Sequence, residues 1–457
     1  MQRVFGLAFG TLLLASANSA AAQKPSAPVS ILPPVFAAPP TVQPTVQQPP
    51  VQLPPVVVPP AITLPPPPVA PNWTLADVRG LLVSIRAVGA EGLFPADYLP
   101  DQLVAAMAAG EGPALNELAT RQFGRLAGDL RDGRTPFSAR VQWYVRDPDA
   151  QAMPTDVLLS EALATGDFAS VLVKLTPTSA DYAALKASLA ATPASDVTKL
   201  KLIRANMERW RWLPNDLGFR YVIANVPEMQ LRFVVNAKLI RSYKAVVGKP
   251  GETATPQLAE MAQGVVFNPT WTVPQSIIKN ELGGMISRSP GGGSSGAYTW
   301  KRYADGSLSV VQKAGPNNAL GLMKIDMPNP HAIFVHDTPA RERFNQANRA
   351  LSHGCVRAER ASELGILLAI VMGQVEAKES VEILRSGKTT KVPFKENIPV
   401  YIAYFTMATG VDGKMQPFGD VYGRDKAVFA SLDKPREDKA VGAFQTAPVV
   451  VVKNPGV

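Results

Sequence analysis

The chain has 457 residues, of which 46% are hydrophobic, enough for two or three domains with apolar cores. Its formal net charge of +9 suits an anionic neighbourhood, yet no basic run interleaved with aromatic residues indicates a nucleic-acid partner. Its single cysteine cannot form an intramolecular disulfide.

The amino terminus has the pattern of a cleavable secretory signal. Arg3 precedes an apolar run from Val4 to Ala15, and small residues follow, ending at Ala22. The run is shorter than the roughly 20 residues that a membrane-spanning helix needs. We therefore expect residues 1–22 to be removed on export, and the mature protein to be soluble and periplasmic.

Residues 23–72 are dominated by proline with valine, alanine and glutamine. Such a composition cannot form a packed core and favours polyproline II conformations. We interpret it as a disordered linker, with a proline-rich ligand for a partner protein as the alternative.

A mostly helical domain is expected at residues 73–205. Thr74 can cap a helix whose apolar residues recur at spacings of three and four. Similar patterns recur near residues 115–130 and at 181–189. The apolar residues of the first helix are Val78, Leu81, Leu82 and Ile85.

From residue 206 to about 430 the pattern changes to β-rich runs separated by turn residues, which predicts a sheet-based domain. Strands are expected at 221–226, 231–235, 239–247, 265–267, 332–335 and 399–406, with a helix over 364–371. Residues 274–321 hold a glycine-rich stretch too loose for a core element, so we expect a long loop that acts as a lid. Residues 431–457 are expected to be a tail.

All three histidines, His331, His336 and His353, lie in one short stretch with the only cysteine, Cys355. Imidazole titrates near neutral pH, and a thiolate is a soft nucleophile. This stretch is therefore the predicted active site. His331 stands at the start of a strand and is assigned no role.

The expected geometry brings the thiol to an imidazole. His336 ends a strand, whereas residues 352–357 lead from a loop into a helix. If the two meet, His336 accepts the thiol proton and the helix amino terminus stabilises the thiolate. The amides of Gly354 and Cys355 can point toward an oxyanion, and Arg357 adds a charge suited to a carboxylate or to the thiolate. A zinc site is not expected, because no structural-zinc spacing frames these residues.

The segments HDTP, from His336 to Pro339, and SHGCVR, from Ser352 to Arg357, resemble the signature of the L,D-transpeptidases with a YkuD-type catalytic domain. The resemblance extends to NMERWRW at 206–212, NPTWTVP at 268–274, NALG at 318–321 and YGRD at 422–425, as in the large multidomain envelope members. It covers most of residues 73–430. One departure is Phe334, where the family often has a tyrosine hydroxyl; another is the expected lack of the peptidoglycan-binding module that many members insert.

This resemblance implies an α+β protein, with a mainly β catalytic domain and a separate, mostly helical scaffold domain. It implies Cys355 as nucleophile, His336 as base and His353 as a further catalytic residue, with Arg357, Gly354 and Ser352 binding substrate. No cofactor is implied.

The function implied is peptidoglycan cross-linking between donor and acceptor stem peptides through a cysteine thioester, with a carbapenem expected to acylate the thiol. Envelope proteins are possible further partners. The alternatives left open are an L,D-carboxypeptidase or hydrolase on the same stem peptides, and a non-catalytic wall-binding scaffold whose cysteine is merely buried.

Overall fold

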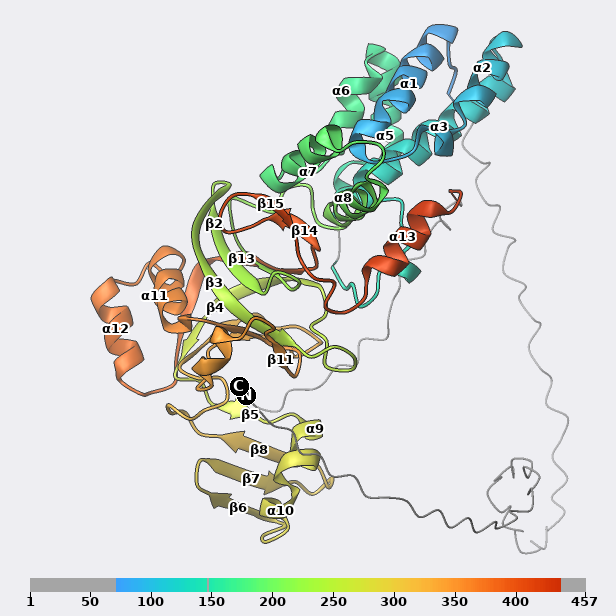
Figure 1. Cartoon of the computed structure of the whole chain (residues 1–457). Helices are drawn as coiled ribbons and strands as arrows, with labels where there is room; N and C mark the ends of the chain where they lie inside the picture. Colours follow the sequence, from blue (N-terminus) through green and yellow to red (C-terminus); the bar gives the residue numbers. More distant parts are fainter. Residues whose placement is uncertain (1–70, 146–147, 437–457) are drawn as a thin grey trace, which may run out of the picture. The chain divides into compact units, whose positions relative to one another are not determined.

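The computed structural model describes residues 71–145 and 148–436. The expected signal peptide, nearly all of the proline-rich linker and residues 437–457 lie outside this part. Helices come first and a β-rich region follows, which confirms the predicted α+β class (Figure 1). Among the described residues, no helix has both the length and the apolarity needed to cross a membrane.

The first helices form their own core, which runs in sequence from Trp73 to Leu175. Thr74 caps α1 (Leu75–Ala87): its hydroxyl accepts from the amide of Asp77, whose carboxylate accepts from the Thr74 amide at 2.9 Å. The predicted apolar face of α1 is buried. The other elements here are η1 (Val88–Glu91), η2 (Pro95–Tyr98), α2 (Pro100–Ala108), α3 (Pro113–Asp132), α4 (Asp149–Ala152), α5 (Thr155–Thr165) and α6 (Phe168–Val173).

Two further helices, α7 (Ala180–Ala191) and α8 (Val197–Trp210), pack into a different core. Their buried residues share one apolar cluster with the sheet, and both helices contact β14 (Met407–Thr409). The first hydrophobic core therefore ends near Leu175, whereas α7 and α8 belong to the core of the β-rich region. The apolar faces of α7 and α8 pack against the β-rich region, and α7 also contacts η1.

The main sheet has the order β11-β3-β12-β10-β9-β4-β13-β1-β2, and β2 pairs with β3 as well as β1. Because of this second pairing, the strands from β3 to β2 close into a ring, with β11 beside β3. The strands are β1 (Arg220–Asn225), β2 (Gln230–Val235), β3 (Lys238–Gly248), β4 (Leu258–Phe267), β9 (Met323–Asp326), β10 (Val335–His336), β11 (Ala350–Ser352), β12 (Val356–Ala358) and β13 (Thr390–Ala403).

The predicted turn between β2 and β3 is a tight hairpin. Asn236 and Ala237 both have positive φ, 48° and 56°, and Val235 pairs with Lys238 across them. Two successive left-handed residues are the conformation that matches the twist of a two-residue hairpin. The hairpin fixes the register of β3, the strand on which β11 and β12 are aligned.

The segment predicted as a loose lid loop, residues 274–321, is a small ordered sheet instead (Figure 1). Its order is β5-β8-β7-β6, and Val273, Ile278, Ile286, Trp300 and Val310 form its core. Gly293 permits this packing, because a Cβ there would lie 2.8 Å from the Trp300 indole. The elements are β5 (Trp271–Thr272), α9 (Gln275–Ile277), η4 (Ile278–Leu282), α10 (Gly283–Ile286), β6 (Gly292–Ser295), β7 (Tyr298–Arg302) and β8 (Leu308–Gln312).

The last helix of the described residues packs against the helical region. α13 (Asp425–Asp433) extends past the predicted start of the tail at residue 431, and Arg436 pairs with Asp129 of α3 through Nε and Oδ2 at 2.8 Å. Both of these side chains are buried. The remaining elements are η3 (Phe137–Ala139), η5 (Arg341–Asn345), α11 (Ala361–Val371), α12 (Ala377–Arg385) and β15 (Met415–Pro417).

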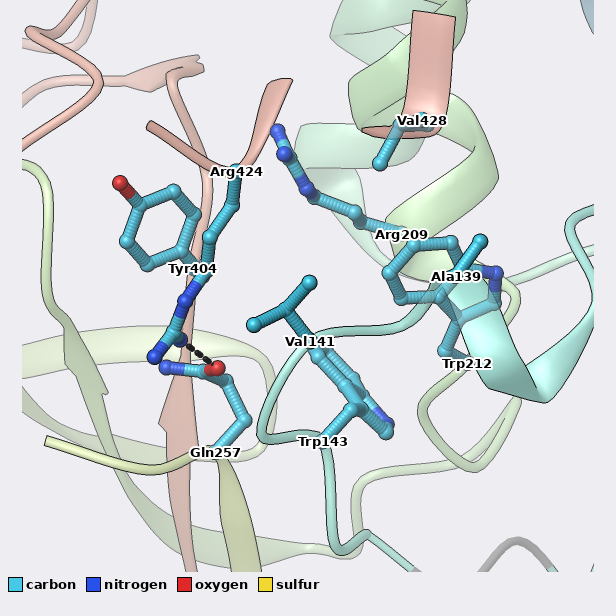
Figure 2. A pocket seen from close by; sticks show the side chains of 9 residues that line it. All are labelled: Ala139, Val141, Trp143, Arg209, Trp212, Gln257, Tyr404, Arg424 and Val428. Carbon is cyan, nitrogen blue, oxygen red and sulfur yellow. Dashed lines mark hydrogen bonds between the residues drawn. The ribbon is translucent and has the colours of Figure 1, made fainter. Parts of the chain in front are cut away.

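A small cavity of about 10 Å³, close to the room that one water molecule needs, lies where α8, α13 and residues 139–143 meet the sheet (Figure 2). Arg424 of the YGRD segment reaches across it and donates to the side chain of Gln257. No residue of the SHGC segment lines this cavity. Its lining consists of Ala139, Val141, Trp143, Arg209, Trp212, Gln257, Tyr404, Arg424 and Val428.

Candidate active site

His336 lies at the end of β10, between β9 and β12, and is 4% exposed. Its Nδ1 lies 2.5 Å from the carbonyl oxygen of Asp337. A carbonyl only accepts, so Nδ1 carries the ring proton and Nε2 has the free lone pair. Local backbone geometry therefore selects the tautomer that a general base requires.

The SHGC segment is a short loop between β11 and β12. The hydroxyl of Ser352 donates to the Cys355 carbonyl at 2.6 Å and accepts from the Gly354 amide at 3.1 Å. Gly354 has a φ of +118°, which favours glycine. A Cβ at this position would also lie 3.1 Å from Ile333. Ser352 and Gly354 thus fix the loop that presents the thiol.

A second set of hydrogen bonds joins this loop to Thr255 and to the YGRD segment. Thr255 donates through its hydroxyl to the Gly354 carbonyl at 2.8 Å and accepts from the Gly248 amide at 2.8 Å. The hydroxyl of Tyr422, in the YGRD segment, donates to the Gly248 carbonyl at 2.7 Å and accepts from the Thr255 amide at 3.1 Å. The YGRD segment is therefore tied to the cysteine loop through Thr255, which bonds both Tyr422 and Gly354.

Cys355 is half-buried, and its Sγ donates to the carbonyl oxygen of Ala332 at 3.8 Å. Burial raises the pKa of the Cys355 thiol, while the Phe334 amide and the charges of Arg357 and Lys324 act in the opposite direction. The resting sulfur is thus a neutral thiol, not the stabilised thiolate that the sequence predicts.

Residues 352–357 do not lead directly into a helix as predicted, because Val356–Ala358 form β12. Val356 pairs with Val335, and Arg357 pairs with His336. The next helix, α11, begins only at Ala361. The helix amino terminus expected at Cys355 is therefore not there, and that part of the prediction is wrong, whereas the helix predicted over residues 364–371 is confirmed by α11.

The strand register nevertheless brings Cys355 and His336 together. His336 is the register partner of Arg357, and Cys355 precedes Arg357 by two residues. The two are thus diagonal neighbours on one face, with Cα atoms about 8 Å apart for ordinary strand spacing. In the described residues no hydrogen bond joins the two side chains, since each is bonded to a backbone carbonyl.

Positive charge surrounds this pair. Burial, followed by the charges of Arg357 and Lys324, lowers the pKa of His336 to about 3, although hydrogen bonding to the Asp337 and Leu320 backbones opposes this shift. The ring is therefore neutral at physiological pH. A neutral imidazole beside a neutral thiol can accept a proton only as the sulfur attacks.

Comparison with known protein families identifies the domain that contains Cys355 and His336. Residues 219–371 match the family model described as L,D-transpeptidase catalytic domain, and residues 69–189 match the one described as scaffold domain. The first match contains both His336 and Cys355. This chain carries an L,D-transpeptidase catalytic domain. The resemblance predicted from the sequence is confirmed, and the catalytic domain is joined to a scaffold domain.

One curated relative is the "Putative L,D-transpeptidase" of Haemophilus influenzae, 30% identical over 238 residues. The match covers 49% of this chain and 48% of the relative, so the chain spans about half of that protein's length. Two solved structures are similar at 14% identity and cover 40% of this chain: the L,D-transpeptidase from Mycobacterium smegmatis (58% of that chain, TM-score 0.22) and L,D-transpeptidase 1 of Mycobacterium tuberculosis (60%, TM-score 0.19). The assignment rests on the family models.

The sequence-predicted site residues occupy three environments in the L,D-transpeptidase catalytic domain. Ser352 and Gly354 are buried in the loop, Cys355 and Arg357 are half-buried, and His353 is exposed. The Gly354 amide is engaged by Ser352, so it does not point toward an oxyanion as predicted. Of the two amides proposed for that role, only that of Cys355 remains.

Sequence reasoning missed the residues that hold His336 in place. The carboxylate of Asp337 accepts from the Leu322 amide at 2.9 Å, and the side-chain oxygen of Asn318 accepts from the Leu320 amide at 2.8 Å. These bonds fix the NALG turn, whose Leu320 backbone lies close enough to the imidazole to raise its pKa. The signal was present, because NALG and HDTP both belong to the family resemblance.

A contact from outside the sheet was also missed. The ring of Tyr144 lies 4.2 Å from that of His331, centroid to centroid. His331 directly precedes Ala332, whose carbonyl accepts from Cys355 and whose φ is +53°. The segment between α3 and α4 therefore packs next to the cysteine loop, which no local pattern in the sequence indicates.

Gly321→Ala should disturb the site through Asp337. Gly321 has a φ of +61°, and a Cβ there would lie 2.5 Å from three side-chain atoms of Asp337. We expect a loss of about 1–3 kcal/mol in the free energy of unfolding, together with slower acylation of Cys355, measured by urea denaturation and mass spectrometry. Gly387→Ala is the matched control, because its φ is +67° but its surroundings are open. Equal losses in both variants would show that the Asp337 contact is unimportant.

Stability should fall as pH is lowered from about 6.5 toward 3, in part through His336. An unfolded histidine has a pKa near 6.5, whereas folding lowers the pKa of His336 to about 3. The unfolded chain therefore binds more protons in this window, so the stabilisation is complete above it and is lost by about 1.4 kcal/mol per pH unit within it. The denaturation free energy of His336→Gln should depend less steeply on pH, and identical slopes would contradict this account.

Proposed function

We propose that the protein is a peptidoglycan L,D-transpeptidase that forms cross-links between stem peptides through a thioester on Cys355. One observation carries the proposal. The match to the L,D-transpeptidase catalytic domain includes the only cysteine of the chain and His336, which are diagonal neighbours on paired strands. The Asp337 carbonyl fixes the tautomer of this histidine. The L,D-transpeptidase family acts on peptidoglycan peptides. A neutral thiol with the cations Lys324 and Arg357 nearby is compatible with such a substrate.

The reaction has two acyl transfers. The thiol leaves the Ala332 carbonyl and gives its proton to Nε2 of His336 as the sulfur attacks the carbonyl carbon between the L-centre and the terminal D-residue of a donor peptide. The carbon–nitrogen bond breaks, and the imidazolium returns the proton to the leaving amine. An amine of an acceptor peptide then attacks the thioester and gives its proton to His336. The carbon–sulfur bond breaks, and His336 passes the proton to the sulfur, which restores the thiol.

The developing oxyanion needs donors. The Cys355 amide supports this role, because the Gly354 amide is held by Ser352 and Phe334 has no hydroxyl. His353, exposed on the same loop, is assigned to contact with the substrate peptides.

Incubating the purified protein with disaccharide tetrapeptides tests the function. Cross-linked dimers, identified by mass spectrometry, are the expected products. Tripeptides without dimers would indicate that water resolves the thioester, as in an L,D-carboxypeptidase. Intact tetrapeptide after long incubation would contradict an enzymatic role and favour a non-catalytic wall-binding scaffold.

The substrate also requires that the protein be exported to the periplasm. The signal pattern of residues 1–22 supports this proposal, although these residues lie outside the described part of the chain. Fractionation of expressing cells, with amino-terminal sequencing of the mature protein, tests it. An uncleaved cytoplasmic product would contradict it.

A further inference from the structure

Three ionisable side chains form one row across three adjacent strands. His336 on β10 is the register partner of Lys324 on β9 and of Arg357 on β12. Directly paired residues on neighbouring strands point to the same face, and neighbouring strands are about 4.8 Å apart. The side chains of Lys324 and Arg357 therefore leave the sheet on opposite sides of His336, and both charges act on its imidazole.

Within residues 71–145 and 148–436, neither cation forms an ion pair with an acidic side chain, although the charge of Asp326 acts on Lys324. The ammonium of Lys324 lies over the Phe334 ring, 4.7 Å from its centroid, and the nearby carboxylate of Asp326 is held by Lys391 at 2.6 Å. The side chain of Arg357 forms no hydrogen bond or ion pair with any residue in the described ranges, and its Nε is buried. Half-buried charges are costly unless an anion neutralises them.

The reaction supplies a suitable anion. The residue that leaves the donor peptide carries its amine and its carboxylate on one carbon atom. When the imidazole of His336 reaches that amine to protonate it, the carboxylate lies only two bonds further along. The two cations beside the ring are then at the place where the carboxylate arrives.

We propose that Lys324, together with Arg357, binds the terminal carboxylate of the leaving residue, so that Lys324 determines specificity for donors that end at this residue. The inference rests on the proposed function. Burial and the charges of Arg357 and Lys324 lower the pKa of His336. The bound carboxylate offsets the contribution of the two charges, and this makes His336 a stronger base once the correct donor is in place.

The test compares a disaccharide tetrapeptide with its carboxy-terminal amide, using the full chain. The wild-type protein should prefer the free acid by about 10-fold or more in kcat/KM. Lys324→Met, which keeps the length of the stem, should lose most of this preference, and Lys324→Arg should keep it. Lys378→Met is the charge-matched control, because Lys378 lies on α12 with its side chain 90% exposed. Equal slowing of acid and amide in Lys324→Met would overturn the proposal.

A second measurement needs no turnover. The Cys355 thiol is alkylated with iodoacetate, which carries a carboxylate, or with neutral iodoacetamide, and both rates are followed by intact mass. The ratio of the two rates should fall about fivefold in Lys324→Met, because the reagent's charge loses its partner. If neither the wild-type protein nor any variant consumes either donor, the proposed function is wrong, whatever the alkylation rates show. An unchanged alkylation ratio would overturn the carboxylate site independently.

Discussion

Cys355→Ser should abolish acylation and turnover. A serine hydroxyl in the same place has a far higher pKa than the thiol, and one imidazole of depressed basicity cannot activate it. We expect the rate of tetrapeptide consumption to fall by at least about three orders of magnitude. A carbapenem should add its mass to the wild-type protein and leave the serine variant unchanged.

The chain offers a clean control for this experiment. Cys355 is the only thiol, so the variant contains none, and any remaining carbapenem adduct would contradict the assignment. The Cys355 side chain makes one weak hydrogen bond to a carbonyl, which serine can replace. The thermal midpoint should therefore change little, and the loss of activity cannot be attributed to unfolding.

His336→Ala should slow acylation by a carbapenem by about two to four orders of magnitude. The variant lacks the Nε2 lone pair that the Asp337 carbonyl makes available. The deficit should shrink as pH rises toward the pKa of the thiol, because the thiolate then forms without a base. Time courses of adduct mass between pH 6 and 9 measure both effects. A deficit that is the same at every pH would show that His336 has another role.

The local elements were predictable where one short pattern decides them. The Thr74 cap, the apolar face of α1 and the Asn236-Ala237 turn all follow from residues within a single turn or hairpin. The lid segment was not predictable in this way, because its glycine run indicates a loop. Only the approach of Trp300 to Gly293, across paired strands, explains why glycine is needed there.

Within the site, the sequence indicates which segment holds the reactive side chains, but not the secondary structure that positions them. Clustering of histidines and the lone cysteine indicates the segment, but the helix expected after Cys355 is a strand, because β10 and β3 pair with it from both sides. Lys324 carries no signal of its own, since one lysine in a strand is ordinary. Its place beside His336 follows only from the order of the strands in the sheet.

The packing of α7 and α8 decides where this polypeptide can be divided. A fragment starting at residue 206 would remove most of α8 and all of α7, and would expose the apolar surface that they cover. The connection between these two helices, residues 192–196, is by contrast almost entirely at the surface. Extra sequence can be accommodated at that connection while both hydrophobic interiors stay intact.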